Sequence, residues 1–206
     1  MRLVAPRFVI SGTDTDIGKT VFAAALAGAI GARYWKPVQA GTEPETDSQT
    51  VARLAGVETL PEANCFKMAA SPHQAAAAEG VTIDTDALTP PSGPLVIEGA
   101  GGLMVPLTRT TLNIDVFARW GLPLILCART ALGTINHALL SVEAIRARAI
   151  PLLGIAFIGD ENKESESIII EKSGAKRLGR LPRLDRLNRE TLAAAYAANF
   201  RTEDFQ

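Results

Sequence analysis

One segment near the N-terminus constrains the fold more than any other feature. The residues Ser11-Gly12-Thr13-Asp14-Thr15-Asp16-Ile17-Gly18-Lys19-Thr20 follow a short apolar run and precede a stretch of helical character. Phosphate-binding loops occur in this context, because backbone N–H groups of the loop and of the helix N-terminus point at bound phosphate. Lys19 would then reach the terminal phosphate oxygens, and the Thr20 hydroxyl would ligate Mg²⁺. Five residues separate Gly12 from Gly18, one more than in the common pattern.

The rest of the chain alternates between short apolar runs and longer helical stretches. Strands are predicted at 8–11, 33–38, 95–98, 122–127, 152–158 and 175–181, and helices at 19–30, 48–54, 114–120, 136–148, 164–173 and 189–198. Strands that alternate with helices imply a mostly parallel sheet with helices on both faces. The sequence therefore predicts one α/β domain of P-loop NTPase type over residues 1–206, with six strands and a frayed end after Ala198.

Charge and composition exclude several classes of protein. The 21 basic and 22 acidic residues leave a net charge of -1, so nothing in the balance favours nucleic acid as a partner. No stretch approaches the ~20 apolar residues of a membrane span, and the first residues have no signal-peptide core. Cys65 and Cys127 cannot form a disulfide framework. We expect a cytoplasmic protein without membrane or nucleic-acid partners.

Three further positions fall at predicted strand ends or helix starts. Glu98 ends the third strand and is followed by Gly99-Ala100-Gly101-Gly102, so it could ligate Mg²⁺ or could be a solvated residue of a glycine-rich turn. Lys36 ends the second strand, where ligands of open α/β folds bind, although a single lysine is most often a surface residue. Asp47 could equally be the N-cap of a helix.

The phosphate loop itself contains two carboxylates, Asp14 and Asp16. Negative charge beside a triphosphate is repulsive unless a metal ion or a cationic substrate offsets it. An amine-bearing substrate is therefore expected to come close to this loop.

These motifs together resemble those of the dethiobiotin synthetases. The resemblance is carried by the loop 12–20, by Trp35-Lys36-Pro37-Val38-Gln39-Ala40-Gly41, by Ser71-Pro72-His73, by 98–102 and by Leu132-Gly133-Thr134-Ile135-Asn136-His137-Ala138-Leu139. The longer spacing in the loop is this family's own variant. The resemblance implies ATP-dependent carboxylation and ring closure of 7,8-diaminononanoate with CO₂, giving dethiobiotin, ADP and phosphate, with Mg²⁺ as cofactor and ATP as co-substrate.

The resemblance also implies a role for individual residues. Lys36, Lys19 and Thr15 would be catalytic, and Thr20, Asp47 and Glu98 would hold Mg²⁺. The nucleotide would contact Thr13, Asp14, Asp16, Ile17, Gly18, Lys19, Thr20, Asp47, Glu98, Gly99, Ala100, Gly101, Gly159, Asp160 and Pro182. The substrate would contact Thr15, Lys36, Ala40, Gly133, Thr134 and Asn136. The last three open a helix that the family uses across a subunit boundary, which implies a homodimer with shared sites.

Two positions depart from the family pattern. Ala40 replaces a small hydroxyl residue, and Gly159 replaces an asparagine.

Three other functions compete with this interpretation. A switch ATPase of the partitioning kind would carry a lysine where this chain has Asp14. An amide synthetase of the corrin pathway would need a second domain, for which 206 residues leave no room. The presence of Lys19, Thr20, Lys36 and Glu98 argues against an inactive nucleotide-binding protein.

Overall fold

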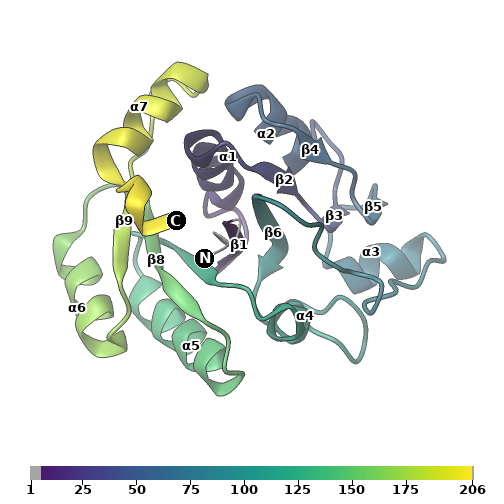
Figure 1. The fold of residues 1–206 in the computed structure, drawn as a ribbon. Helices are drawn as coiled ribbons and strands as arrows, with labels where there is room; N and C mark the ends of the chain where they lie inside the picture. Colours follow the sequence, from purple (N-terminus) through teal and green to yellow (C-terminus); the bar gives the residue numbers. More distant parts are fainter. Residues whose placement is uncertain (1–5, 206) are drawn as a thin grey trace, which may run out of the picture.

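The computed structural model describes residues 6–205, which contain one large parallel sheet (Figure 1). Seven strands are ordered β4-β2-β6-β1-β7-β8-β9, and each neighbouring pair is parallel. The strands are β1 (Arg7–Gly12), β2 (Arg33–Trp35), β4 (Thr59–Leu60), β6 (Leu95–Gly102), β7 (Leu124–Arg129), β8 (Leu152–Ile158) and β9 (Arg177–Leu181). The predicted α/β fold is confirmed, but the sheet has one strand more than expected.

Helices cover both faces of this sheet (Figure 1). One face packs against α1 (Lys19–Ile30), α2 (Asp47–Ala55), α7 (Arg189–Asn199) and the short 3-10 helix η1 (Thr202–Phe205). The other packs against α4 (Asn113–Trp120), α5 (Thr134–Ala147) and α6 (Lys163–Ser173). Val9 and Ile10 show the alternation, because these adjacent residues belong to the two opposite core clusters and are both completely buried.

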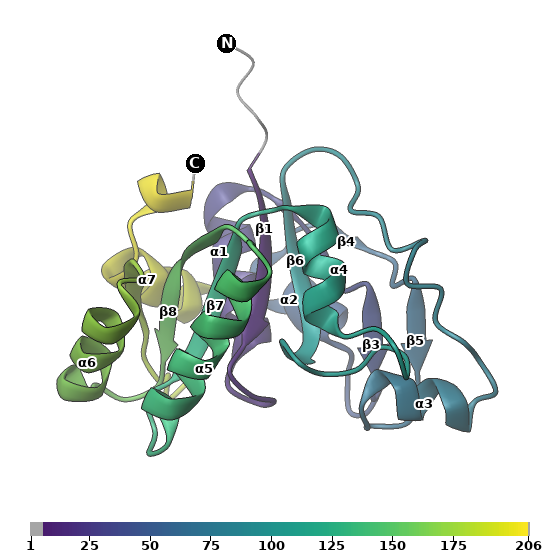
Figure 2. The same cartoon turned by 90° about the horizontal axis from the view of Figure 1, so that it is seen from below.

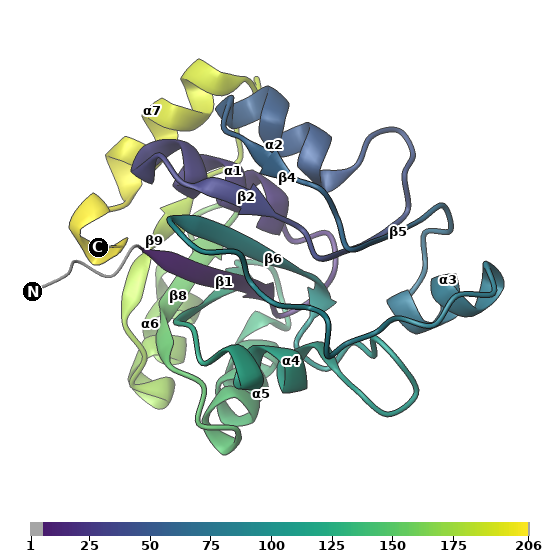
Figure 3. The same ribbon diagram turned by 45° about the vertical axis from the view of Figure 1, so that its right-hand side comes forward.

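A smaller unit lies at the end of the molecule away from α6 and β9 (Figures 2 and 3). It contains β3 (Val38–Ala40) paired with β5 (Asn64–Phe66), and α3 (Pro72–Ala78). The prediction of one strand over 33–38 was wrong, because Lys36 and Pro37 separate β2 from β3 and proline has no N–H for the ladder. The strands β4 and β5 and the helix α3 were not predicted as elements.

Residues 199–205 are packed against the rest of the chain, and for them the expectation of a frayed end was wrong. Phe205 is completely buried, and its ring meets Phe8 edge-on at 6.1 Å between centroids. Tyr196 and Phe200 stack at 4.9 Å beside it. Isolated aromatic residues have no periodicity that a sequence pattern could detect, yet each buries a large apolar surface.

Strand order determines which loops meet. The strands β2, β6 and β1 are neighbours, and parallel strands present their carboxyl ends at the same edge of a sheet. The residues after β2, the second half of β6 and the loop after β1 are therefore brought together. The prediction that this strand ends at Glu98 was wrong, because β6 continues through Gly99 to Gly102 and Glu98 lies within the strand. Within residues 6–205 no helix has the length and apolar character that crossing a membrane requires.

Candidate active site

The loop between β1 and α1 has a conformation that depends on Gly18. This residue caps α1 with φ 93°, a left-handed conformation that glycine adopts without steric cost. A Cβ atom at this position would lie 2.9 Å from Ile158 Cγ2. The first turn of α1 carries no acidic side chain, so the positive end of the helix dipole is not neutralised from within the helix. The helix start therefore suits a bound anion.

Lys19 is the first residue of α1, directly after this loop. Its side chain is buried, and Nζ donates a hydrogen bond to the Asp14 carbonyl oxygen at 2.9 Å. Burial lowers the pKa of Lys19, while the charge of Glu98 acts in the opposite direction. The ammonium is thus held within the loop by a backbone acceptor.

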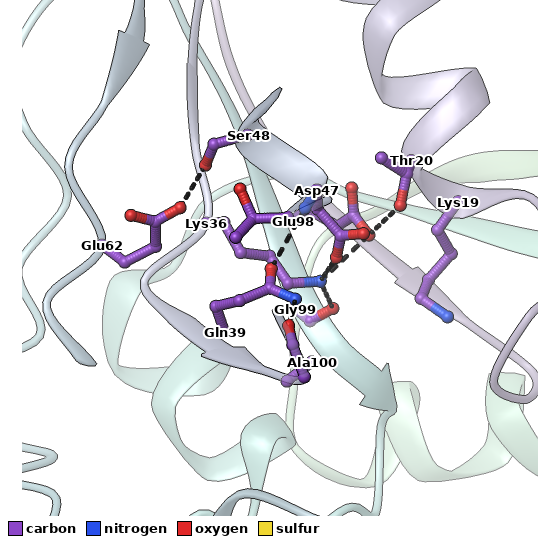
Figure 4. A network of polar contacts seen from close by, with 12 residues as sticks. Lys19, Thr20, Lys36, Gln39, Asp47, Ser48, Glu62, Glu98, Gly99 and Ala100 are labelled. Atoms are coloured by element: carbon purple, nitrogen blue, oxygen red, sulfur yellow. Dashed lines mark hydrogen bonds and ion pairs between the residues drawn. The ribbon is translucent and has the colours of Figure 1, made fainter. Parts of the chain in front are cut away.

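Lys36 lies between the buried Glu98 and the half-buried Asp47 (Figure 4). Its Nζ lies 2.5 Å from Asp47 Oδ2, 3.1 Å from Glu98 Oε1 and 3.2 Å from the Gly99 carbonyl oxygen. Lys36 is 4% exposed and Glu98 is 1% exposed. Burial disfavours the ammonium, but the charges of Glu98 and Asp47 outweigh this effect and raise the pKa of Lys36. The side chain is therefore a protonated cation with two carboxylate partners.

Glu98 connects this cluster to the phosphate loop and to the core. Its Oε1 accepts hydrogen bonds from Thr20 Oγ1 at 3.0 Å and from Lys36 Nζ at 3.1 Å. Its Oε2 accepts one from the Tyr34 hydroxyl at 2.9 Å. Both oxygens of this buried carboxylate are thus satisfied, as a buried charge requires.

The N-terminus of α2 directs Asp47 toward Lys36. Thr46 is the N-cap and forms a capping box with Gln49, so Asp47 is the first residue of the helix and not its cap. The Asp47 N–H donates to Gln39 Oε1 at 3.3 Å. The next residue, Ser48, donates from Oγ to Glu62 Oε1 at 2.5 Å. Hydrogen bonds of Thr46 before Asp47 and of Ser48 after it therefore hold the first turn of α2 in place.

A cavity of about 740 Å³ opens over these groups. It is lined by many of the residues that the sequence singled out: Thr15, Asp16, Ile17, Gly18, Lys19, Thr20, Lys36, Ala40, Asp47, Glu98, Ala100 and Gly101. Gly99 contributes its carbonyl oxygen to Lys36. Thr13 and Asp14 instead line a separate hollow of about 350 Å³, and Asp14 Oδ2 lies 3.7 Å from Arg129 Nη2. Of the two loop aspartates, only Asp16 lines the main cavity of about 740 Å³.

A second hollow, of about 600 Å³, lies on the other side of the loop residues Asp16–Gly18. Its lining includes Thr130, Gly159 and Asp160, whereas Pro182 does not line it. Gly159 has φ 125°, and a Cβ atom there would lie 2.5 Å from Thr130 Oγ1. Thr130 thus occupies the space that a side chain at position 159 would need.

The start of α5 lies apart from the main cavity. Gly133 caps the helix with φ 92°, and Thr134 is buried with no hydrogen-bond partner for its hydroxyl among residues 6–205. Asn136 is exposed. The helix begins at Thr134, two residues before the predicted start. Within one chain the structure does not bring these three residues to Lys36.

Sequence reasoning missed two polar residues that support the site, Tyr34 and Gln39. Tyr34 precedes Lys36 by two positions, so the alternation of a strand could have placed both side chains on the same face. Gln39 lines the cavity and holds the Asp47 backbone, but a single glutamine in a short strand carries no signal of this kind.

Comparisons with known proteins agree with this geometry. A family model described as an AAA domain matches residues 6–191. Among solved structures, a ParA family ATPase from Chlorobium tepidum has a TM-score of 0.55 at 10% identity and covers 95% of this chain and 98% of its own. The MinC:MinD complex of Aquifex aeolicus has a TM-score of 0.53 at 10% identity, and the match covers 93% of this chain and 86% of the chain in that complex. At these identities the likeness shows the fold alone.

Curated relatives are much closer in sequence. The ATP-dependent dethiobiotin synthetase of Rhodopseudomonas palustris strain TIE-1 is 64% identical over 98% of both chains. Its counterpart in Agrobacterium fabrum is 62% identical, covering 97% of this chain and 96% of the relative. The dethiobiotin synthetase of Sphingopyxis alaskensis is 58% identical, and the match covers 97% of this chain and 99% of the relative. With this identity over nearly the full length, the chain belongs to the ATP-dependent dethiobiotin synthetases.

Proposed function

We propose that the cavity around Lys36 is where this chain performs the ATP-dependent synthesis of dethiobiotin, in biotin biosynthesis, that its family carries out. One observation carries the proposal. A buried, protonated lysine lies between two carboxylates beside a phosphate-binding loop, at the edge of a cavity of about 740 Å³. A cation that is preorganised in this way stabilises negative charge that develops during a reaction, because the cation does not have to reorient as the charge forms.

The phosphate loop supports a nucleotide site. The triphosphate would bind the N–H groups of residues 13–20, with Lys19 Nζ exchanging the Asp14 carbonyl for a phosphate oxygen. The backbone at Gly99, Ala100 and Gly101 would lie close to the phosphates. The base would enter the hollow lined by Gly159 and Asp160, with Pro182 at its border. This hollow shares residues Asp16–Gly18 with the main cavity.

The oxygen donors near Lys36 fit Mg²⁺. Thr20 Oγ1 and Lys36 Nζ both contact Glu98 Oε1, and Asp47 Oδ2 lies 2.5 Å from the same Nζ. No group of three or more His, Cys, Asp or Glu residues suited to a metal occurs within residues 6–205. Two carboxylates and a hydroxyl still suffice, because Mg²⁺ usually binds one or two carboxylates together with substrate phosphates. When bound, the ion would neutralise phosphate charge.

The chemistry proceeds in three balanced steps. One amine of 7,8-diaminononanoate adds to CO₂ and loses a proton, which gives a carbamate. A carbamate oxygen attacks the γ-phosphorus of ATP and displaces ADP. The second amine then attacks the carbonyl carbon, expels phosphate, loses a proton and closes the ureido ring. Negative charge is present or shifts at each step, so positioned cations are the main requirement.

The named side chains divide this work. Lys36 would stabilise the carbamate and the transferred phosphoryl group, and Lys19 would hold the terminal phosphate. Thr15 and Asp16 line the cavity, where a carboxylate favours binding of an amine and accepts its proton. Ala40 lies in the same lining and contributes no hydroxyl.

A homodimer would complete the substrate site. Met104 and Leu140 are exposed and line one hollow of about 350 Å³, and Leu132, two residues before α5, is 100% exposed. A second chain would cover these apolar side chains. Gly133, Thr134 and Asn136 at the start of α5 would then donate to the substrate carboxylate of the neighbouring subunit. Light scattering would show a dimer, and Leu132→Glu would dissociate it. A monomer at all concentrations would contradict this arrangement.

Both cysteines are free thiols, with Cys65 exposed and Cys127 buried. This supports a reducing compartment, and we place the enzyme in the cytoplasm. Residues 1–206 would act as a single synthetase domain, since the main cavity is lined both by loops of the large sheet and by Gln39, Ala40 and Pro72 of the smaller unit.

The test is phosphate release from MgATP with bicarbonate, measured with and without 7,8-diaminononanoate. Release should depend on the diamine and should disappear in Lys19→Ala. Equal release without the diamine would contradict the proposal and would favour an ATPase of the switch type.

A further inference from the structure

The two oxygens of Glu98 have different surroundings. Oε1 accepts from Thr20 Oγ1 at 3.0 Å and from Lys36 Nζ at 3.1 Å. Oε2 accepts from the Tyr34 hydroxyl at 2.9 Å. Tyr34 is 0% exposed and Glu98 is 1% exposed, so this hydrogen bond is shielded from solvent. A hydrogen bond in such surroundings is strong, and its loss leaves a buried acceptor unpaired.

The fold fixes the position of the Tyr34 hydroxyl. Tyr34 lies on β2 and pairs in register with Val96 of β6, two residues before Glu98. Its ring belongs to the core cluster between the sheet and α1, α2 and α7, whereas the adjacent Trp35 faces the opposite cluster. Close packing leaves the ring little rotational freedom. The hydroxyl therefore approaches Glu98 from inside the protein.

This geometry points to Tyr34 as a positioning residue for the Mg²⁺ site, an inference that rests on the proposed function. By holding Oε2, the Tyr34 hydroxyl fixes the carboxylate plane and keeps Oε1 directed at Thr20 and Lys36, among the residues that would hold the ion. Without it, the Glu98 carboxylate could rotate and Oε1 would lose its fixed direction. Groups that orient a ligand in this way tune metal affinity without touching the metal.

The chain contains its own matched control. It has two tyrosines, and the other one, Tyr196, is also buried. The Tyr196 hydroxyl has no hydrogen-bond partner within residues 6–205, and its ring stacks on Phe200. Tyr34→Phe and Tyr196→Phe therefore remove the same atom from two buried rings, but only the first changes the surroundings of Glu98.

The first experiment compares Mg²⁺-dependent binding of a non-hydrolysable ATP analogue to these two variants and to the wild type by calorimetry. Tyr34→Phe should need about tenfold more Mg²⁺ for half-maximal binding, and Tyr196→Phe should match the wild type. An unchanged Mg²⁺ requirement in folded Tyr34→Phe would overturn the inference. The comparison needs no turnover, so it remains separate from the proposed function, which fails if the wild type binds nucleotide but makes no dethiobiotin.

The second experiment asks whether Tyr34 acts through Glu98. Glu98→Gln and the double variant Glu98→Gln/Tyr34→Phe should have the same Mg²⁺ requirement, because the oriented carboxylate is absent from both. A further loss in the double variant would overturn the inference and would assign Tyr34 a packing role. If Tyr34→Phe alone fails to fold, folding of the double variant becomes the readout. A folded double variant would show that the defect acts through the unpaired charge of Glu98, and a double variant that also fails to fold would overturn the inference.

Discussion

Lys36 and Arg183 each pair with an aspartate, but the two pairs lie in opposite surroundings. Lys36 is 4% exposed, and its Nζ lies 2.5 Å from Asp47 Oδ2 and 3.1 Å from Glu98 Oε1. Arg183 is 79% exposed, and its Nε lies 3.6 Å from Asp160 Oδ2, a side chain that is 81% exposed. The buried cation cannot lose its partners without a large cost, whereas solvent screens the exposed pair.

This difference in solvent exposure distinguishes the two ends of the site, one at Lys36 and the other at Gly159. At the Lys36 end, hydrogen bonds from Thr20, Tyr34 and Lys36 hold the Glu98 carboxylate in place. At the Gly159 end, the aspartate and arginine that border the hollow are both exposed to solvent. Catalysis needs charges that are fixed in position, and only the charges at the Lys36 end are held in this way. Four changes test how far this contrast extends.

Lys36→Met should give the largest effect, because it removes the preset cation and keeps an unbranched side chain. We expect kcat to fall at least about 100-fold, with nucleotide affinity near the wild-type value. The free energy of unfolding without Mg²⁺ should also fall by about 3–5 kcal/mol, since Glu98 becomes an unpaired buried charge. Steady-state kinetics and urea unfolding would measure both effects.

The matched control is Lys163→Met, which removes an exposed cation at 83% exposure. It should leave kcat unchanged. Full activity in Lys36→Met would remove Lys36 from the chemistry.

Glu98→Gln should come next, with an effect on metal-dependent binding. Loss of an outer-shell partner alone costs about 10- to 100-fold in metal affinity, so loss of a ligand oxygen's charge should cost at least tenfold. Calorimetric titration of an ATP analogue at several Mg²⁺ concentrations would show it. Glu190→Gln, at the exposed start of α7, is the control, and an identical Mg²⁺ requirement in both variants would exclude Glu98 as a ligand.

Gly159→Ala should have an intermediate effect at the other end of the site. The residue has φ 125°, and a Cβ atom would lie 2.5 Å from Thr130 Oγ1. We expect a loss of about 1–3 kcal/mol in the free energy of unfolding, together with weaker nucleotide binding. Thr130→Ala should restore part of the loss in the double variant, because it removes the clashing oxygen. No recovery would mean that backbone strain alone sets the cost.

Arg183→Ala should have the smallest effect. Because both side chains of the Arg183–Asp160 pair are exposed, the urea midpoint should not change measurably at physiological salt. Asp160→Asn should behave in the same way. A clear loss of stability in either variant would show that the rim is more ordered than its exposure indicates.

The sequence predicted the parts of the fold that carry strong local signals. The helix α1 and the strand β8 have the bounds that periodicity predicts, because each is long, apolar and bounded by turn residues. The two-residue strand β4 is too short for such a signal. Phe205 is buried through contacts with Phe8, which is distant in sequence, and with Tyr196 of the preceding helix α7, so no local pattern could place it.

The site shows the same limit. The loop 12–20 is contiguous, so its spacing alone predicted a phosphate site. The contacts of Lys36 depend on the order β2-β6-β1 and on the start of α2. The sequence could propose Lys36, Asp47 and Glu98 by resemblance, but not their mutual distances. Strand alternation would place Tyr34 on the same face as Lys36, but a tyrosine in an apolar strand also fits the pattern of a core residue, so its hydroxyl was not singled out.

The most direct test follows labelled carbon through the reaction. Wild-type protein and Lys36→Met would be incubated with MgATP, 7,8-diaminononanoate and ¹³C-bicarbonate, and products would be quantified by mass spectrometry. The wild type should form dethiobiotin labelled at its ureido carbon in equal amount to ADP, and Lys36→Met should form neither at a comparable rate. ADP without labelled dethiobiotin in the wild type, or equal rates in both proteins, would contradict a catalytic role for the buried Lys36 cluster.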